Sequence, residues 1–254
     1  MTLHIKLLQL EEFLDFIELP RRGLIYAGAH VGEYIGSFLC LGFDTILAIE
    51  PNPEAFEHLR RLESQRIRCV QAAALDRDGE SDYYSVPGIP TLNSVLRPRL
   101  EHFGADFGEA LMTRAPEKLR TRCMRIDTMV RERAPQCNFD LLYMNIQGCE
   151  GLAIAGASET LKTVGFIIAE TNLEERYHGA AAHHVLVDRL AGLGFDLSNL
   201  EVYQTMAANH GEAWFLRRDL RERAGTRIRQ ENEAYFLAQS PSRRELPSRE
   251  SETR

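Results

Sequence analysis

The amino-acid sequence predicts an α/β fold with a mostly parallel seven-stranded sheet and an antiparallel final strand. Short apolar segments alternate with helical ones over most of the chain, which is the pattern of parallel strands joined by crossover helices. Two strand-like segments within residues 201–217 follow each other without a helix, so they are expected to pair antiparallel. With 254 residues, 44% of them hydrophobic, the chain can bury the core of one such domain.

The first half of the chain begins with a helical pattern. Leu7, Leu10, Leu14 and Ile17 recur at helical spacing and predict an amphipathic helix within residues 1–22. After it, the predicted elements alternate strictly: strand 23–28, helix 32–42, strand 45–50, helix 53–64 and strand 67–75. This order is that of a βαβαβ unit with right-handed crossovers.

The second half begins with a long irregular region, residues 85–114, which we expect to cover the substrate side of a site. Residues 118–126 alternate like an edge strand, and Asp127 or Thr128 is expected to cap the short helix that follows. The further predicted elements are helices 150–162 and 181–195 and strands 139–146, 164–172, 201–206 and 211–217. The predicted main domain covers residues 23–218, with a helix over 219–238 and a disordered tail over 239–254.

The charge of the chain is uneven. The net charge is −7, and residues 217–254 contain ten arginines against seven acidic residues, so the preceding part carries −10. An acidic body is a poor platform for a phosphate backbone, so nucleic acid is not an expected partner. The five cysteines include no C-x-x-C pair, and no apolar stretch reaches the length of a membrane span. These observations predict a cytoplasmic protein without membrane contact.

A glycine turn, Gly28-Ala-His-Val-Gly32, follows the first strand. Such a turn can place free backbone N–H groups and a helix N-terminus at the carboxyl ends of the strands, where open α/β sheets bind ligands. The dinucleotide fingerprint would require glycines at the positions of His30 and Glu33, which disfavours a nicotinamide oxidoreductase. The alternative is that the glycines serve only the shape of the turn.

Glu50 stands at the end of the second predicted strand. A carboxylate at this place can accept two hydrogen bonds from a ribose diol. The ligand is therefore expected to contain a ribose and to need no pyrophosphate cradle. S-adenosylmethionine satisfies both conditions.

Seven segments resemble, in order, the motifs of the FkbM family of methyltransferases: YAGAHVG, AIEPNPEAFEHL, AAALDRDGE, LNSV, RIDTMV, DLLYMNIQGCEGLAIAGA and IIAETN. The resemblance spans roughly residues 23–215. It implies a Rossmann-like class I methyltransferase fold that uses S-adenosylmethionine to methylate hydroxyls of natural products or sugars. The cofactor-binding residues that it implies, together with the glycine turn, are Tyr26, Gly28, Ala29, His30, Gly32, Glu50, Pro51, Ala73, Ala74 and Asn145.

Two motifs depart from the family pattern. Tyr26 stands where an acidic residue usually precedes the glycines, and Asn145-Ile-Gln147-Gly148 replaces the usual Asp-x-Glu-Gly. The second change removes two negative charges from the expected reaction crevice, so no metal ion is expected. A catalytically inactive binding or partner protein with the same fold is therefore the alternative function.

A hydroxyl acceptor needs a group that takes its proton. Glu170, at the end of the fifth parallel strand, and His178, in the connection after it, are the candidate catalytic residues; Gln147 and Asn172 are candidates for substrate contact. The alternatives are a structural role for Glu170, an ordinary surface histidine at 178 and amides that tie down the turn. The sequence thus predicts an S-adenosylmethionine-dependent O-methyltransferase for a small hydroxylated molecule. Its C-terminal helix could dock a second subunit in a homo-oligomer.

Overall fold

The largest element of the computed structural model is a seven-stranded sheet; the structure describes residues 3–103, 115–203 and 210–239. Its strands are β1 (Gly23–Ala27), β2 (Thr45–Ile49), β3 (Ile67–Val70), β7 (Leu141–Met144), β8 (Phe166–Asn172), β9 (Phe195–Val202) and β10 (His210–Arg217). They lie in the order β3-β2-β1-β7-β8-β10-β9, and only β10 runs antiparallel to its two neighbours. The predicted mostly parallel sheet with an antiparallel final strand is confirmed.

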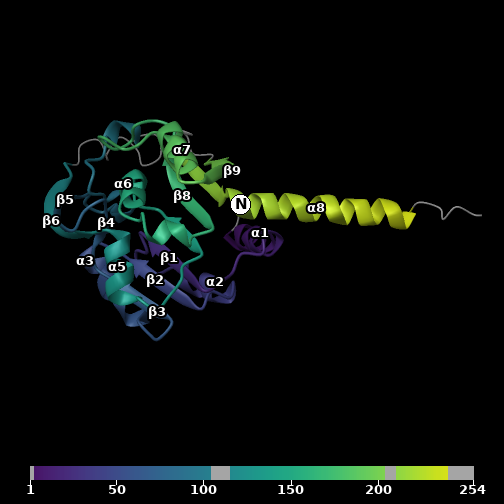
Figure 1. The fold of residues 1–254 in the computed structure, drawn as a ribbon. Coiled ribbons are helices and arrows are strands. Elements are labelled where there is room, and N and C mark those ends of the chain that lie inside the picture. Colours follow the sequence, from purple (N-terminus) through teal and green to yellow (C-terminus); the bar gives the residue numbers. More distant parts are fainter. Residues whose placement is uncertain (1–2, 104–114, 204–209, 240–254) are drawn as a thin grey trace, which may run out of the picture.

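Helices cover both faces of this sheet (Figure 1). One face packs against α1 (Leu3–Phe16), α2 (Ile35–Cys40) and α3 (Pro53–Leu59), and the other against α5 (Ile126–Arg133), α6 (Glu150–Ala155) and α7 (His183–Gly192). Alternate strand residues serve the two cores: Tyr26 faces the α1 side and Ile25 the α6 side. The central strands are buried on both faces, which explains their continuous apolar sequence.

A second, three-stranded sheet lies beside the carboxyl ends of the main strands. It consists of β4 (Ala73–Ala74), β6 (Glu117–Met124) and β5 (Gly79–Ser85), in that order. Two predictions were wrong here. Residues 67–75 form two strands in different sheets instead of one, and the predicted edge strand over residues 118–126 ends at Met124 and is the central strand of this sheet.

The predicted cap of α5 was also wrong. Arg125 occupies the N-cap position and forms no side-chain cap. The Asp127 carboxylate instead accepts hydrogen bonds from the backbone N–H groups of Glu159 and Thr160, at 3.0 and 2.8 Å. These bonds outweigh the effect of burial and lower the pKa of Asp127. Asp127 therefore fastens the chain that follows α6.

The C-terminal helix α8 (Arg218–Gln239) extends away from the body of the molecule (Figure 1). Strand β9 begins before the predicted 201–206 segment, whose end lies outside the described residues, as does the predicted tail from residue 240 onward. No helix within the described ranges combines the length and the apolarity that a membrane crossing requires.

Candidate active site

A cavity of about 270 Å³ opens at the carboxyl ends of β1, β2 and β7, where the strand order of the sheet reverses. This switch point is where open α/β sheets bind their ligands. We call the cavity at this point the first cavity. Its walls are formed by Tyr26, Gly28, His30, Glu33, Tyr34, Ile49, Glu50, Pro51, Asn52, Ala72, Ala73, Ala74, Leu75, Tyr83, Pro90, Thr91, Asn93, Ser94, Val95, Asn145, Ile146, Gln147 and Cys149.

The glycine turn borders the first cavity. We expected its backbone N–H groups to be free, but those of three residues are bonded within the protein. Those of Gly28 and Ala29 donate to the Ile49 carbonyl at 3.0 and 2.9 Å, and that of Gly32 donates to Ala29 at 2.8 Å. Gly28 has a φ of 80°, and a Cβ there would lie 1.9 Å from the backbone oxygen of Asn145. The turn therefore needs glycine at 28 because two strand ends approach each other closely.

Ala29 and Gly32, two of the predicted cofactor residues, do not line the first cavity. Ala29 is fully buried in the core under α1 and α2. A Cβ on Gly32 would lie 2.6 Å from a methyl carbon of Leu62 and 3.1 Å from one of Leu59. The steric alternative therefore accounts for Gly32, and the remaining eight predicted cofactor residues do line the cavity.

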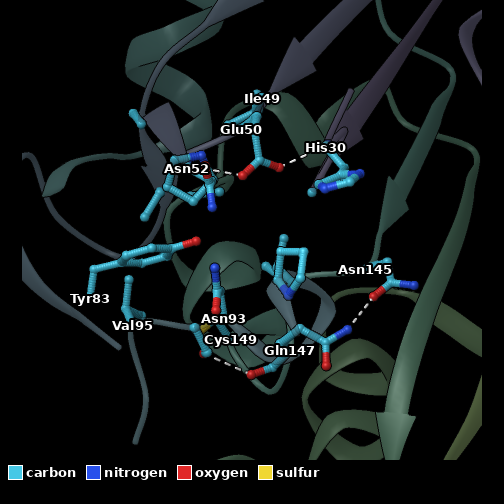
Figure 2. A pocket seen from close by; sticks show the side chains of 18 of the residues that line it. His30, Ile49, Glu50, Asn52, Tyr83, Asn93, Val95, Asn145, Gln147 and Cys149 are labelled. Atoms are coloured by element: carbon cyan, nitrogen blue, oxygen red, sulfur yellow. Dashed lines mark hydrogen bonds between the residues drawn. The ribbon is translucent and has the colours of Figure 1, made fainter. Parts of the chain in front are cut away.

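The Glu50 carboxylate points into the first cavity from the end of β2 (Figure 2). Its two oxygens accept hydrogen bonds from the backbone N–H groups of His30 and Asn52, both at 2.8 Å. Burial raises the pKa of Glu50, while these two N–H groups act in the opposite direction. The side chain is thus held in one orientation, with lone pairs left for a ligand in the cavity.

His30 links the turn to the same carboxylate. Its φ of 48° is in the left-handed region, which is uncommon outside glycine, and its ring contacts the Glu33 carboxylate at 2.6 Å. Gln147, on the opposite wall, has a φ of 55°. Two of the three non-glycine residues with positive φ in the described part of the chain therefore line this one cavity, and such strain concentrates at functional sites.

Both polar atoms of the Gln147 amide form hydrogen bonds to protein groups. Its nitrogen donates to Asn145 Oδ1 at 2.7 Å and to Glu170 Oε2 at 2.8 Å, and its oxygen accepts the hydroxyl of Tyr177 at 2.7 Å. This network ties down the turn after β7, as the structural alternative required. Gln147 borders the first cavity as a fixed wall rather than as a free hydrogen-bonding group.

Glu170 and Asn172 are buried in β8 and do not line the first cavity. Burial raises the pKa of Glu170 to about 7, although nearby Arg176 lowers it. Asn172 lies opposite His210 in the sheet. Glu170 thus lies behind Gln147, which forms part of the cavity wall, and contacts its amide. Asn172 is separated from the first cavity.

His178 is not brought to the first cavity either. It is exposed, its backbone N–H donates to the Arg97 carbonyl at 2.9 Å, and its side chain borders a different hollow with Arg77 and Asp82. His178 therefore does not reach the first cavity. The surface alternative fits its position, and a proton-accepting role in the cavity has no geometric support.

Several residues of the first cavity could not be predicted from the sequence. Tyr83, Asn93 and Val95 come from the second sheet and the segment after it (Figure 2). The segment LNSV was the only signal for this wall, and it did not reveal what the residues touch. Cys149 also lines the cavity, but burial raises the pKa of its thiol to about 12, which suits a packing residue and not a nucleophile.

A second cavity adjoins the first on the α1 side of the sheet. Tyr34 and Asn145 line both cavities. The other residues of the second cavity are Gln9, Leu10, Phe38, Tyr143, Ile168, Asn199, Glu201, Tyr203, Glu212 and Trp214. Two hollows that share a wall at the switch point can hold a cofactor and an acceptor next to each other.

Comparison with known proteins agrees with this geometry. Residues 27–197 match the methyltransferase FkbM domain. The chain is 26% identical over 187 residues to the 2-O-methyltransferase NoeI of Sinorhizobium fredii (strain NBRC 101917 / NGR234), covering 70% of this chain and 75% of that protein.

Solved structures with a similar fold include two methyltransferases with bound cofactor forms. Magnesium protoporphyrin IX methyltransferase (ChlM) from Synechocystis PCC 6803, with bound SAM, has a TM-score of 0.45 and 9% identity, covering 84% of this chain and 78% of that one. The 1,6-didemethyltoxoflavin-N1-methyltransferase of Burkholderia thailandensis has a TM-score of 0.44 and 14% identity, covering 83% and 77%. Since the family domain covers most of the chain, this protein belongs to the FkbM family of S-adenosylmethionine-dependent methyltransferases.

Proposed function

We propose that this methyltransferase holds S-adenosylmethionine in the first cavity and methylates a hydroxyl group of a small molecule. The observation that carries the proposal is the Glu50 carboxylate, which is fixed by two N–H groups and aimed into a largely apolar cavity at the switch point. It would accept the hydrogen bonds of the ribose diol. Ala73 and Ala74, with Tyr83, would form the apolar walls around the adenine.

The methionine end of the cofactor would lie toward Tyr26, His30 and Asn145. Tyr26 is buried against Phe38 and Tyr143, with ring centroids 5.4 Å away in each case, so it supplies an apolar wall where the family pattern has a carboxylate. Glu33 is the other carboxylate on the lining of this cavity besides Glu50. It is the candidate to face the cofactor's ammonium group.

When bound, the cofactor supplies a sulfonium-activated methyl group, which passes to the acceptor oxygen as the sulfur regains its electron pair and the hydroxyl proton leaves. The protein must align the acceptor and exclude water. It must also offer a base for the proton. Glu201 and Glu212 line the second cavity, whereas Glu170 does not, so the first two are the better candidates to accept that proton.

Calorimetric titration with S-adenosylhomocysteine tests the cofactor site. Glu50→Gln should weaken binding about tenfold or more, because a charge-assisted hydrogen bond contributes about 1.5–3 kcal/mol. Glu54→Gln is the matched control, since Glu54 is exposed at the start of α3 and does not line the cavity. Equal affinities of Glu50→Gln and wild type would show that the ribose lies elsewhere.

A binding protein without catalysis is the second candidate function. The neutral residues Tyr26, Asn145 and Gln147 at positions where the family pattern is acidic favour it. Incubation with S-adenosylmethionine and a panel of hydroxylated small molecules, read by mass spectrometry, separates the two. A product heavier by one methylene supports transfer to oxygen once its site is mapped, and binding with no product from any acceptor supports the second candidate.

A further inference from the structure

The second cavity lies between α1 and the main sheet, over β7, β8, β10 and β9, with a volume of about 160 Å³. Because it shares Tyr34 and Asn145 with the first cavity, a molecule in it would lie next to a cofactor bound there. The chemistry of that molecule can be read from the lining of the second cavity, and its identity as the methyl acceptor rests on the function proposed for the first.

Aromatic side chains form much of the second cavity. Tyr34, Phe38 and Tyr143 make one group, with ring centroids 6.2 Å apart for Tyr34 and Tyr143 and 5.6 Å apart for Phe38 and Tyr143. Trp214 is held from behind by Phe13 and Phe166, at centroid distances of 5.2 and 5.6 Å. Tyr203 completes the aromatic lining. The rings are thus packed in place before any ligand arrives.

Carboxylates lie beside these rings. Glu212 of β10 stands directly opposite Glu201 of β9, and on its other side directly opposite Glu170 of β8. Residues opposite each other in a sheet point to the same face, so three glutamates form one row, which is an unfavourable arrangement for like charges. Only Glu201 and Glu212 line the second cavity.

Two positive groups of the described residues lie at the Glu170 end of this row. Arg176 lowers the pKa of Glu170, and His210 Nε2 lies 3.9 Å from that carboxylate. The twelve lining residues of the second cavity include no lysine, arginine or histidine. One oxygen of Glu212, in the middle of the row, accepts the indole N–H of Trp214 at 3.0 Å, which fixes the carboxylate against an aromatic face. The charge of Glu212 therefore borders the cavity.

Aromatic faces next to carboxylates form the chemical surroundings that attract an organic cation. A metal ion fits less well, because the described residues contain no group of three or more His, Cys, Asp and Glu side chains that could hold one. We propose that the second cavity binds the methyl acceptor and that this acceptor carries a positively charged nitrogen, as an amine or a quaternary ammonium group, besides its hydroxyl.

Trp214 makes the proposal directly measurable, because it is the single tryptophan of the chain and it lines the second cavity. We would titrate the full chain with choline, with ethanolamine and with 3,3-dimethylbutan-1-ol, the uncharged isostere of choline, and follow tryptophan fluorescence. At least one of the two cations should give a saturable change with an affinity about tenfold or more above that of the neutral alcohol.

Glu212→Gln should reduce the affinity for that cation at least about fivefold, because it keeps an acceptor for the Trp214 indole and removes only the charge. Glu222→Gln, an exposed position on α8, should leave the affinity unchanged. Equal affinity for the cations and the neutral alcohol, or no saturable binding of either cation, would overturn the proposal.

Calorimetry with S-adenosylhomocysteine on the same sample keeps the two proposals apart. Cofactor binding without cation binding contradicts the inference about the second cavity alone. Cation binding without cofactor binding supports a cation site and contradicts the assignment of the first cavity.

Discussion

Gly28 and Asn145 approach each other so closely that a Cβ on the glycine would lie 1.9 Å from the asparagine's backbone oxygen. This contact joins the ends of β1 and β7 at the wall of the first cavity. Gly28 also has a φ of 80°, a conformation that other residues adopt at a cost. Two separate restraints thus act on one residue.

Gly28→Ala should lower the free energy of unfolding by more than about 2 kcal/mol and weaken S-adenosylhomocysteine binding, because the ends of β1 and β7 must move apart. Chemical denaturation and calorimetry measure the two effects. Gly36→Ala is the control: Gly36 is an exposed position in α2 with no heavy atom within 4 Å of an added Cβ, so the same change there should be neutral or stabilising by up to about 1 kcal/mol. A stable Gly28→Ala variant with unchanged binding would contradict this account of the turn.

Stability should fall as the pH rises from 5 to 8. Burial, together with the charge of Glu170, raises the pKa of Glu150 to about 8, and burial raises that of Glu170 to about 7. Their ordinary value is 4.5, so between these limits the folded state binds more protons than the unfolded state. The neutral carboxyl groups therefore stabilise the folded state at pH 5, and this stabilisation is lost as the pH rises through their folded-state pKa values.

Glu150→Gln should flatten this dependence, since it keeps an oxygen that can accept the Ile146 N–H and cannot ionise. One pKa unit corresponds to about 1.4 kcal/mol. The difference in free energy of unfolding between wild type and variant should therefore change by on the order of 2–4 kcal/mol between pH 5 and 8. Urea titrations at several pH values measure it. The exposed Glu159 provides the control, Glu159→Gln, whose pH dependence should follow that of wild type.

Divalent metal ions should have no part in the reaction. The residues after β7 are amides instead of carboxylates, and the amide of Gln147 is already bonded to Asn145, Glu170 and Tyr177. Methyl transfer to an identified acceptor should therefore survive exhaustive chelation and gain nothing from Mg²⁺, Mn²⁺ or Ca²⁺. Activity that disappears with the chelator and returns with one of these ions would contradict the prediction.

The main sheet could be predicted because its signals are local. Apolar runs such as residues 24–27 and 46–49 are buried on both sides, and each is followed by a helix. The second sheet gave no such signal: β4 has two residues, and β5 carries glycine and charged residues in its first half. Its strands are defined by pairing with β6, some forty residues further along the chain, which periodicity does not reveal.

Some residues of the candidate site could likewise be predicted from local sequence signals, and others could not. Gly28 and Glu50 could be predicted because each directly follows a strand, and parallel strands end at one edge of the sheet. Ala29 and Gly32, which were predicted to bind the cofactor, do not line the first cavity, because a tight turn points successive residues in different directions. Tyr83 and Glu212 reach their cavities only through long-range packing.

The position of β10 between β8 and β9 has a consequence for how the protein forms during synthesis. β9 leaves the ribosome before β10, yet among the described strands of the main sheet it pairs with β10 alone, so it must wait for the segment that follows it. The elements around the first cavity come from residues 23–149 and are complete well before that moment. The nascent chain can therefore build the first cavity before the second, which closes when the last strand inserts.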